Sequence, residues 1–122
     1  MSKMICLDTY AIFEIFQQNP ELTGIISENF LLTEITLAEL YQVMLRNQNK
    51  ATAQFWYKKF NPYAVSVKME TLIKAIEFKH ENKKKNISFF DAVGYMYAFE
   101  NKIDFVTGDK EFKGRPFVRF IK

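Results

Sequence analysis

Four acidic residues stand where alternating strands and helices would bring them together. Asp8 directly follows an apolar run, Asp109 follows another by two residues, and Glu39 and Asp91 each stand in a predicted first helical turn. Converging carboxylates repel one another unless a cation lies between them, and Mg²⁺ and Mn²⁺ prefer such oxygen ligands. A metal held in this way can ionise a water molecule and neutralise charge on a phosphodiester. The four acids therefore predict a metal centre suited to phosphodiester hydrolysis.

The elements that must position these acids are short apolar runs and longer segments of helical periodicity. We expect strands at 4–7, 30–33, 64–67, 104–107 and 117–120, the last at an edge, and helices over 8–17, from Pro20, from Thr36, and over 51–59, 68–83 and 88–100. This order predicts an α/β fold with a short, mostly parallel sheet of four to five strands. Ligands of such sheets bind beyond the carboxyl ends of the strands, where the four acids fall. Asp104 falls at the opposite end.

Helix capping offers a purely structural explanation for each acid. Thr36 and Glu39 have the spacing of a capping box, and Ser88 and Asp91 form a near relative of one. The two aspartates that follow strands could each cap the next helix or turn. A capping carboxylate still has a second oxygen for a metal, so the two interpretations remain open together.

Length and composition predict one soluble domain over residues 1–122. The chain is 48% hydrophobic and 25% charged, with a formal net charge of +3. Cys6 is the lone cysteine, so an intramolecular disulfide is excluded and a reducing compartment is expected. The apolar start is too short for a signal peptide, and no apolar run approaches the roughly 20 residues of a membrane span. We expect a cytoplasmic protein.

Basic and aromatic residues suggest binding surfaces. Lys83, Lys84 and Lys85 precede the helix that carries Asp91, and Lys110 follows Asp109, so these lysines are candidate RNA contacts. A solvated loop is the more common role for such a run. The chain also has 13 Phe, 6 Tyr and 1 Trp, more than a small core needs, which favours a partner surface. Among these rings, Tyr10 and Phe13 are expected to be packing residues. In the helix over 68–83, the spacing predicts four buried side chains, Leu72, Ile73, Ile76 and Phe78.

Four segments, each around one acid, carry a family resemblance. They are ICLDT at 5–9, TLAEL at 36–40, FDAV at 90–93 and FVTGDKEF at 105–112. Their order and spacing resemble the PIN-domain family, and more narrowly the VapC-type ribonuclease toxins. The resemblance implies a three-layer α/β/α sandwich and an endoribonuclease that depends on Mg²⁺ or Mn²⁺. The family's catalytic and metal-binding quartet matches Asp8, Glu39, Asp91 and Asp109, and its accompanying hydroxyls match Thr9 and Thr107.

The resemblance also implies a cognate antitoxin protein and RNA as substrate. The abundant aromatic residues fit either an antitoxin surface or a homodimer. One departure is Gly94-Tyr95-Met96-Tyr97, where the family usually has small or aliphatic residues; this segment affects helix packing rather than the acid. Two alternatives stay open. They are a non-catalytic α/β binding module whose acids only cap helices, and a housekeeping RNA-processing nuclease with the same domain. A receiver-type phosphoacceptor domain is disfavoured, because no aspartate lies between Asp8 and Asp91.

Overall fold

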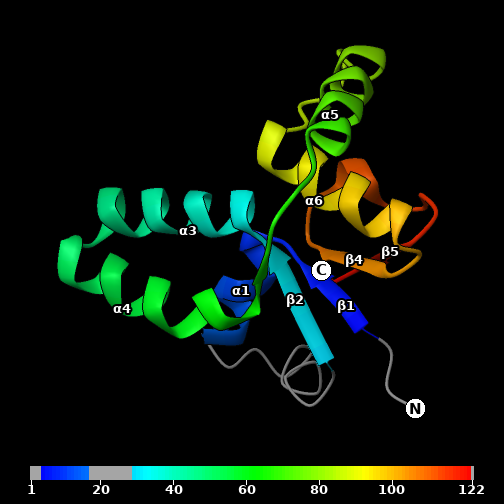
Figure 1. Cartoon of the computed structure of the whole chain (residues 1–122). Coiled ribbons are helices and arrows are strands. Elements are labelled where there is room, and N and C mark those ends of the chain that lie inside the picture. The colour runs from blue at the N-terminus through cyan, green and yellow to red at the C-terminus, as the bar shows by residue number, and fades with distance from the viewer. Residues whose placement is uncertain (1–3, 17–28, 122) are drawn as a thin grey trace.

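A five-stranded parallel sheet forms the centre of the computed structural model, which describes residues 4–16 and 29–121 (Figure 1). The strand order is β3-β2-β1-β4-β5, and every neighbouring pair is parallel. The strands are β1 (Met4–Leu7), β2 (Asn29–Thr33), β3 (Ala64–Val65), β4 (Asp104–Thr107) and β5 (Val118–Phe120). The expected α/β class and the edge position of the last strand are confirmed.

Helices cover both faces of this sheet. They are α1 (Thr9–Phe16), α3 (Glu34–Asn47), α4 (Lys50–Phe60), α5 (Met69–Glu81) and α6 (Phe89–Glu100), with short 3₁₀ turns η2 (Asn61–Tyr63) and η3 (Lys110–Phe112). In the described part of the chain, none of the helices has the length and apolar character needed to cross a bilayer. Expected helical residues at Gln17 and from Pro20 lie outside the described residues.

The alternation of side chains along β1 creates two separate cores. Ile5 and Leu7 point into one cluster with residues of α1, α3 and α4, while Cys6 points into another with residues of α5 and α6. All three side chains are fully buried. Successive residues of a strand face opposite sides of the sheet, so the central strand joins both layers. The three-layer α/β/α sandwich is thereby confirmed.

Close packing of α6 against β4 depends on Gly94. A Cβ atom at this position would lie 2.7 Å from Cε1 of Phe105, which is fully buried in the second core. Its neighbour Tyr95 is also buried, and the Tyr95 hydroxyl donates a hydrogen bond to the carbonyl of Pro116 at 3.0 Å. The glycine and aromatic residues that depart from the family pattern therefore fit α6 to the sheet.

Helix α3 begins earlier than expected. It starts at Glu34 rather than Thr36, because the Thr33 hydroxyl accepts a hydrogen bond from the Thr36 amide at 3.0 Å and caps the helix. The predicted capping box of Thr36 and Glu39 is therefore wrong, and Glu39 lies beyond the first turn. Strand β3 is also shorter than the expected 64–67 and ends at Val65.

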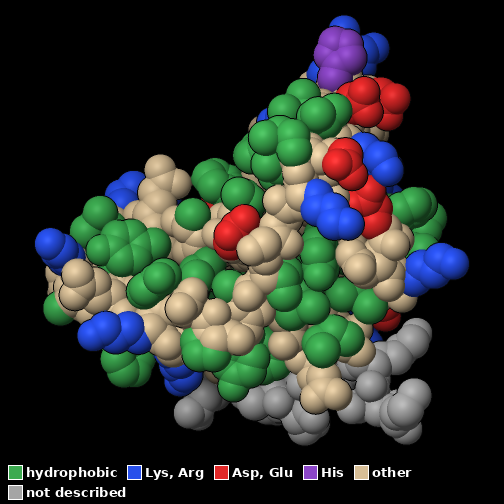
Figure 2. Space-filling view, in the orientation of Figure 1, with side chains coloured by type: hydrophobic (Ala, Val, Ile, Leu, Met, Phe, Trp, Pro, Cys, Tyr) green, Lys and Arg blue, Asp and Glu red, His purple; other side chains and the backbone are tan. Residues whose placement is uncertain are grey.

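Helix α5 projects from the rest of the fold, as Figure 1 shows. It packs mainly on α6 and buries Thr71 and Ala75, while Ile73 and Ile76 are 48% and 55% exposed. Figure 2 shows hydrophobic side chains on the surface of this projecting helix. The expectation that Ile73 and Ile76 are buried is wrong, because a helix packed along one narrow face leaves its other apolar side chains exposed. Leu72 and Phe78 are partly buried, as their contacts with the second core require.

Candidate functional site

The four predicted acids come from four separate segments of the chain and line one cavity. It lies beyond the carboxyl ends of β1 and β4 and has a volume of about 390 Å³. Its described lining consists of Asp8, Thr9, Tyr10, Phe13, Glu39, Asp91, Gly108 and Asp109. The fold thus brings together residues that are up to 101 positions apart in the sequence, from 8 to 109.

The pairing of β1 with β4 places the two strand-exit acids side by side. Leu7 pairs with Val106, and the amide of Asp8 donates a hydrogen bond to the Val106 carbonyl at 3.2 Å. Because the two strands are parallel, both end at the same edge of the sheet. Asp104 pairs with Ile5 at the other end of the same strands and lies 3.6 Å from the Arg119 guanidinium. The structure therefore separates Asp104 from the acid cavity.

Asp8 is almost completely buried, with 2% of its surface exposed. Its Oδ1 atom accepts a hydrogen bond from the Ala11 amide at 2.7 Å and so caps α1. Burial raises the pKa of Asp8 to about 7, although hydrogen bonds from the Thr107 side chain and the Ala11 amide oppose this rise. The charges of Glu39 and Asp109 raise the same pKa further. Asp8 combines a capping role with a carboxyl group that is costly to ionise.

Asp91 faces the cavity from the first turn of α6. Ser88 caps this helix, because its hydroxyl accepts a hydrogen bond from the Asp91 amide at 3.1 Å. Burial raises the pKa of Asp91 to about 8, and the charges of Asp8, Glu39 and Asp109 add to the rise. A hydrogen bond with the Ser88 side chain opposes it. The carboxyl group of Asp91 therefore lies among like charges.

Glu39 is joined to α1 by one side-chain contact. The Thr9 hydroxyl donates a hydrogen bond to Glu39 Oε1 at 2.5 Å. Burial raises the pKa of Glu39, and the hydrogen bond from Thr9 lowers it. Thr9, which the family resemblance singled out, therefore fixes one oxygen of this carboxylate, Oε1.

Thr107 and Asp109 form the part of the site at the end of β4. The Thr107 side chain is fully buried, hydrogen-bonds Asp8 and accepts a hydrogen bond from the Asp109 amide at 3.0 Å. Asp109 Oδ1 accepts a hydrogen bond from the Glu111 amide at 3.0 Å and caps η3. One hydroxyl therefore connects the exits of β1 and β4.

The lining of the cavity carries no positive charge among its described residues. Four carboxylates offer the oxygen donors that Mg²⁺ and Mn²⁺ prefer, and burial, together with the neighbouring acids, raises the pKa of Asp8 and of Asp91. Within residues 4–16 and 29–121, however, no three acidic, His or Cys side chains already stand at the spacing of a complete metal site. The donor set thus fits a hydrated Mg²⁺ or Mn²⁺ ion, with water completing the coordination.

The predicted lysines lie outside this lining. Lys83, Lys84 and Lys85 are exposed in the turn between α5 and α6, and Lys110 is exposed at the start of η3. Two contacts hold the lysine turn against the η3 region. Lys85 Nζ lies 3.5 Å from Glu111 Oε2, and Arg115 Nη2 donates a hydrogen bond to Asn82 Oδ1 at 2.9 Å.

Three lining residues were missed as candidates from the sequence. Tyr10 and Phe13 were expected to pack and do pack against the first core, but both also border the acids. Gly108 allows the Tyr10 ring to lie against the backbone, because a Cβ atom at 108 would fall 2.3 Å from Tyr10 Cε1. The position of Gly108 between Thr107 and Asp109 could have marked it as a site residue from the sequence alone.

Comparisons with known proteins agree with this fold. The structure is similar to VapC20 of Mycobacterium tuberculosis, a sarcin–ricin loop cleaving toxin, with a TM-score of 0.75 and 14% identity over 90% of this chain and 95% of that one. It is similar to VapBC2 of Rickettsia felis bound to promoter DNA, with a TM-score of 0.75 and 17% identity over 98% and 99% of the two chains. For DNA-bound VapBC of Salmonella typhimurium, the TM-score is 0.72, with 19% identity over 99% and 98%.

Sequence comparison gives the family directly. Among curated protein sequences, none matches this chain significantly. The family model described as PIN domain matches residues 5–118, a range that includes all four acids and both accompanying threonines. The chain belongs to the PIN domain family.

Proposed function

We propose that this protein is an endoribonuclease that uses Mg²⁺ or Mn²⁺ to hydrolyse phosphodiester bonds in RNA. The observation that carries the proposal is the cavity itself, in which carboxylates from four separate segments of the chain converge without a positive charge among the described lining residues. Helix capping accounts for the hydrogen bond to one carboxylate oxygen of Asp8 and for that to one carboxylate oxygen of Asp109. It does not explain why Glu39, now outside any capping box, also faces this cavity.

Asp8, Asp91 and Asp109 would hold the metal, and Glu39 would bind it directly or through water. A bound divalent ion lowers the pKa of water and offsets negative charge on the phosphate. Thr9 orients Glu39 through its hydrogen bond to Oε1. Thr107 orients Asp8 and the Asp109 backbone. These two hydroxyls keep the carboxylates in place as the charge between them changes.

RNA reaches the acids through contacts outside the cavity. The cavity repels a phosphate backbone, whereas the exposed lysines at 83, 84, 85 and 110 attract it. The salt bridge from Lys85 to Glu111 and the hydrogen bond from Arg115 to Asn82 keep the lysine turn close to the loop that carries Asp109. Substrate affinity is therefore expected to fall steeply with ionic strength.

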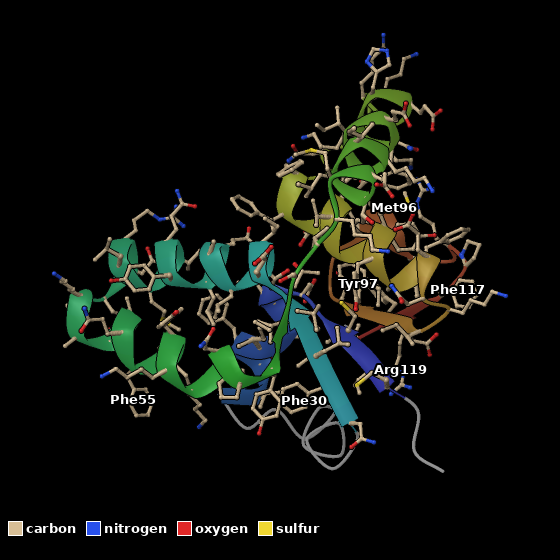
Figure 3. The ribbon with its side chains drawn as sticks, in the orientation of Figure 1. Phe30, Phe55, Met96, Tyr97, Phe117 and Arg119 are labelled. Atoms are coloured by element: carbon tan, nitrogen blue, oxygen red, sulfur yellow. The ribbon has the colours of Figure 1, made fainter. Side chains whose placement is uncertain are left out.

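The biological role that we propose is the toxin of a toxin–antitoxin pair in the cytoplasm. The Rickettsia and Salmonella structures are VapBC assemblies, which supports a small antitoxin protein as partner. Exposed apolar side chains also favour a partner surface, and Figure 3 shows Phe55 pointing outward from α4. An antitoxin that places a basic side chain among the carboxylates would block the metal centre. Co-purification with the product of an adjacent short reading frame tests this role, and a homodimer alone would contradict it.

The decisive test of the enzyme is cleavage of single-stranded RNA by the purified chain in Mn²⁺ or Mg²⁺. Asp91→Asn should lower the cleavage rate at least about 100-fold, since removing one transition-state stabilising group commonly has this effect. Asp104→Asn is the matched control, because Asp104 lies at the other end of the sheet. It should retain activity within a few-fold. Full cleavage by Asp91→Asn, or cleavage that persists in EDTA, would refute the mechanism.

A non-catalytic module remains the second candidate, supported by the capping bonds of Asp8 and Asp109. Calorimetric titration with Mn²⁺ separates the two. The nuclease should bind Mn²⁺ at a specific site that Asp91→Asn weakens, whereas acids that only cap helices should give no specific binding.

A further inference from the structure

The acid cavity has a second wall that the proposed chemistry does not use. Tyr10 and Phe13 border it from α1, and their three-residue spacing places them on the same face of the helix. Ala11 and Ile12, between them, are fully buried in the first core. The core therefore sets the rotation of α1, and this rotation turns the two rings toward the acids.

Tyr10 is held in its place by the loop that carries Asp109. The position where a Cβ atom of residue 108 would stand is 2.3 Å from Tyr10 Cε1 and 2.4 Å from Cδ1. Only a glycine leaves room for the ring there. The ring thus lies directly beside the backbone that presents Asp109, and the aromatic wall is fixed relative to the acids rather than loosely attached.

Phe13 extends this wall by one helical turn. Its side chain is half-buried and packs against the first core, so one part of the ring contacts protein and another part borders the cavity. An aromatic ring that is anchored on one side loses little conformational freedom when a ligand stacks on it. A flexible lysine or arginine in its place would suit a phosphate instead, and none is present among the described lining residues.

The two walls suit the two parts of a nucleotide. Carboxylates with a divalent cation take the phosphate, while aromatic faces take a nucleobase by stacking. The volume of about 390 Å³ lies in the lower part of the range for small-ligand pockets, which suits a single unpaired base. A base in a duplex is stacked on its neighbours and presents no free face to a ring.

We propose that Phe13 and Tyr10 form a base-contact wall that stacks on the unpaired base next to the cleaved phosphodiester. The inference rests on the proposed function for the position of the phosphate. It adds that α1 contributes affinity for one base through contact with Phe13, with a modest base preference set by stacking strength. Gly108 maintains the wall by admitting Tyr10.

The test compares Phe13→Leu, Phe13→Trp and Phe55→Ala. Leucine keeps an apolar side chain but removes the ring, and tryptophan keeps a ring. Phe55 is the control, since it is 58% exposed on α4 and does not line the acid cavity. Thermal melts first establish that each variant is folded. Two readouts follow: the kcat and KM for a single-stranded RNA of mixed sequence in Mn²⁺, with its cleavage positions mapped, and the anisotropy of a labelled RNA pentamer in Ca²⁺.

Phe13→Leu should raise the KM and weaken pentamer binding about tenfold, in line with the loss of one aromatic stack, and should flatten the base preference at the cleavage position. Phe13→Trp should restore binding, and Phe55→Ala should match the wild type. If the enzyme is active and Phe13→Leu changes neither the KM nor the base preference, this inference is wrong, whereas the proposed nuclease activity still stands.

The base-contact wall can also be correct when the proposed nuclease activity is wrong. A wild-type chain that binds the pentamer through Phe13 but cleaves no RNA supports the base-contact wall and overturns the nuclease. A wild-type chain that neither binds nor cleaves RNA overturns both. If Phe13→Leu does not fold, Gly108→Ala provides the second variant. Its added methyl displaces the Tyr10 ring and should likewise weaken pentamer binding, and unchanged binding by a folded Gly108→Ala would contradict the role of Tyr10.

Discussion

Replacing Asp91 by asparagine should make the metal-free protein more stable at alkaline pH. Most ionised carboxylates stabilise a fold, because their pKa is lowered by a partner. Asp91 is the reverse case, since burial and the charges of Asp8, Glu39 and Asp109 raise its pKa from 3.8 to about 8. The amide of Asp91→Asn keeps the shape of the side chain and cannot ionise.

The sign of the pH dependence follows from the protons bound. Between pH 3.8 and about 8, Asp91 holds its proton in the folded chain and has lost it in the unfolded chain. The free energy of unfolding therefore decreases as the pH rises through this window, and the full cost is present above about pH 8. Asp8 adds to the same trend up to about pH 7.

The magnitude can be worked from the raised pKa of Asp91. A rise from 3.8 to about 8 corresponds to roughly 6 kcal/mol that disfavours the ionised carboxyl in the folded state. The four acids share their repulsion and the cavity admits water, so about half of this, ~3 kcal/mol, is expected to be realised at pH 8.5. For a domain of this size ~3 kcal/mol raises the Tm by roughly 10 °C.

Thermal unfolding by circular dichroism in EDTA, at pH 4.0 and pH 8.5, measures this effect. The Tm of Asp91→Asn should exceed that of the wild type at pH 8.5 by far more than at pH 4.0, where the folded carboxyl is protonated and the unfolded carboxyl is only partly ionised. Asp104→Asn is the control, and its Tm should not rise at pH 8.5. A Tm difference between Asp91→Asn and wild type that is the same at both pH values would refute the reasoning.

Three further predictions test the metal, the helix cap and the core. In Mn²⁺ at 100 times its Kd, the wild type should gain about 2.7 kcal/mol of unfolding free energy; Asp8→Asn should lose most of this gain and Asp104→Asn should keep it, as thermal melts with and without EDTA would reveal. Thr33→Ala should cost ~1 kcal/mol in urea denaturation, because it removes the cap of α3; no loss would argue against α3 starting at Glu34. Gly94→Ala should cost about 1 to 3 kcal/mol by the same method, because the new methyl meets Phe105 at 2.7 Å; unchanged stability would mean that α6 can shift away from β4.

Periodicity made the sheet and most helices predictable. The apolar runs at 4–7 and 104–107 are the strands β1 and β4 with the same bounds. Ser88 caps α6 and Asp109 caps η3, as their residue types predict. Local signals of this kind act within a few residues of sequence, and so they can be read without knowing what the chain packs against.

Predictions failed where the outcome depended on a competing local bond or on distant packing. Thr36 was the predicted cap of α3, but its amide donates a hydrogen bond to the Thr33 hydroxyl, so Thr33 is the cap instead. Ile73 and Ile76 have core-like chemistry and helical spacing, yet they are exposed because α5 meets the fold along one face only.

The sequence by itself determined which acids could meet. Asp8 and Asp109 follow β1 and β4, and parallel strands bring such residues to one edge for reasons of chain direction alone. Only the tertiary structure decided what surrounds them. It placed Glu39 against Thr9, 30 residues away, turned Tyr10 and Phe13 toward the acids, and buried Asp8 and Asp91 deeply enough to raise their pKa values. Burial and long-range contact depend on how complete layers pack, and no short stretch of sequence contains that information.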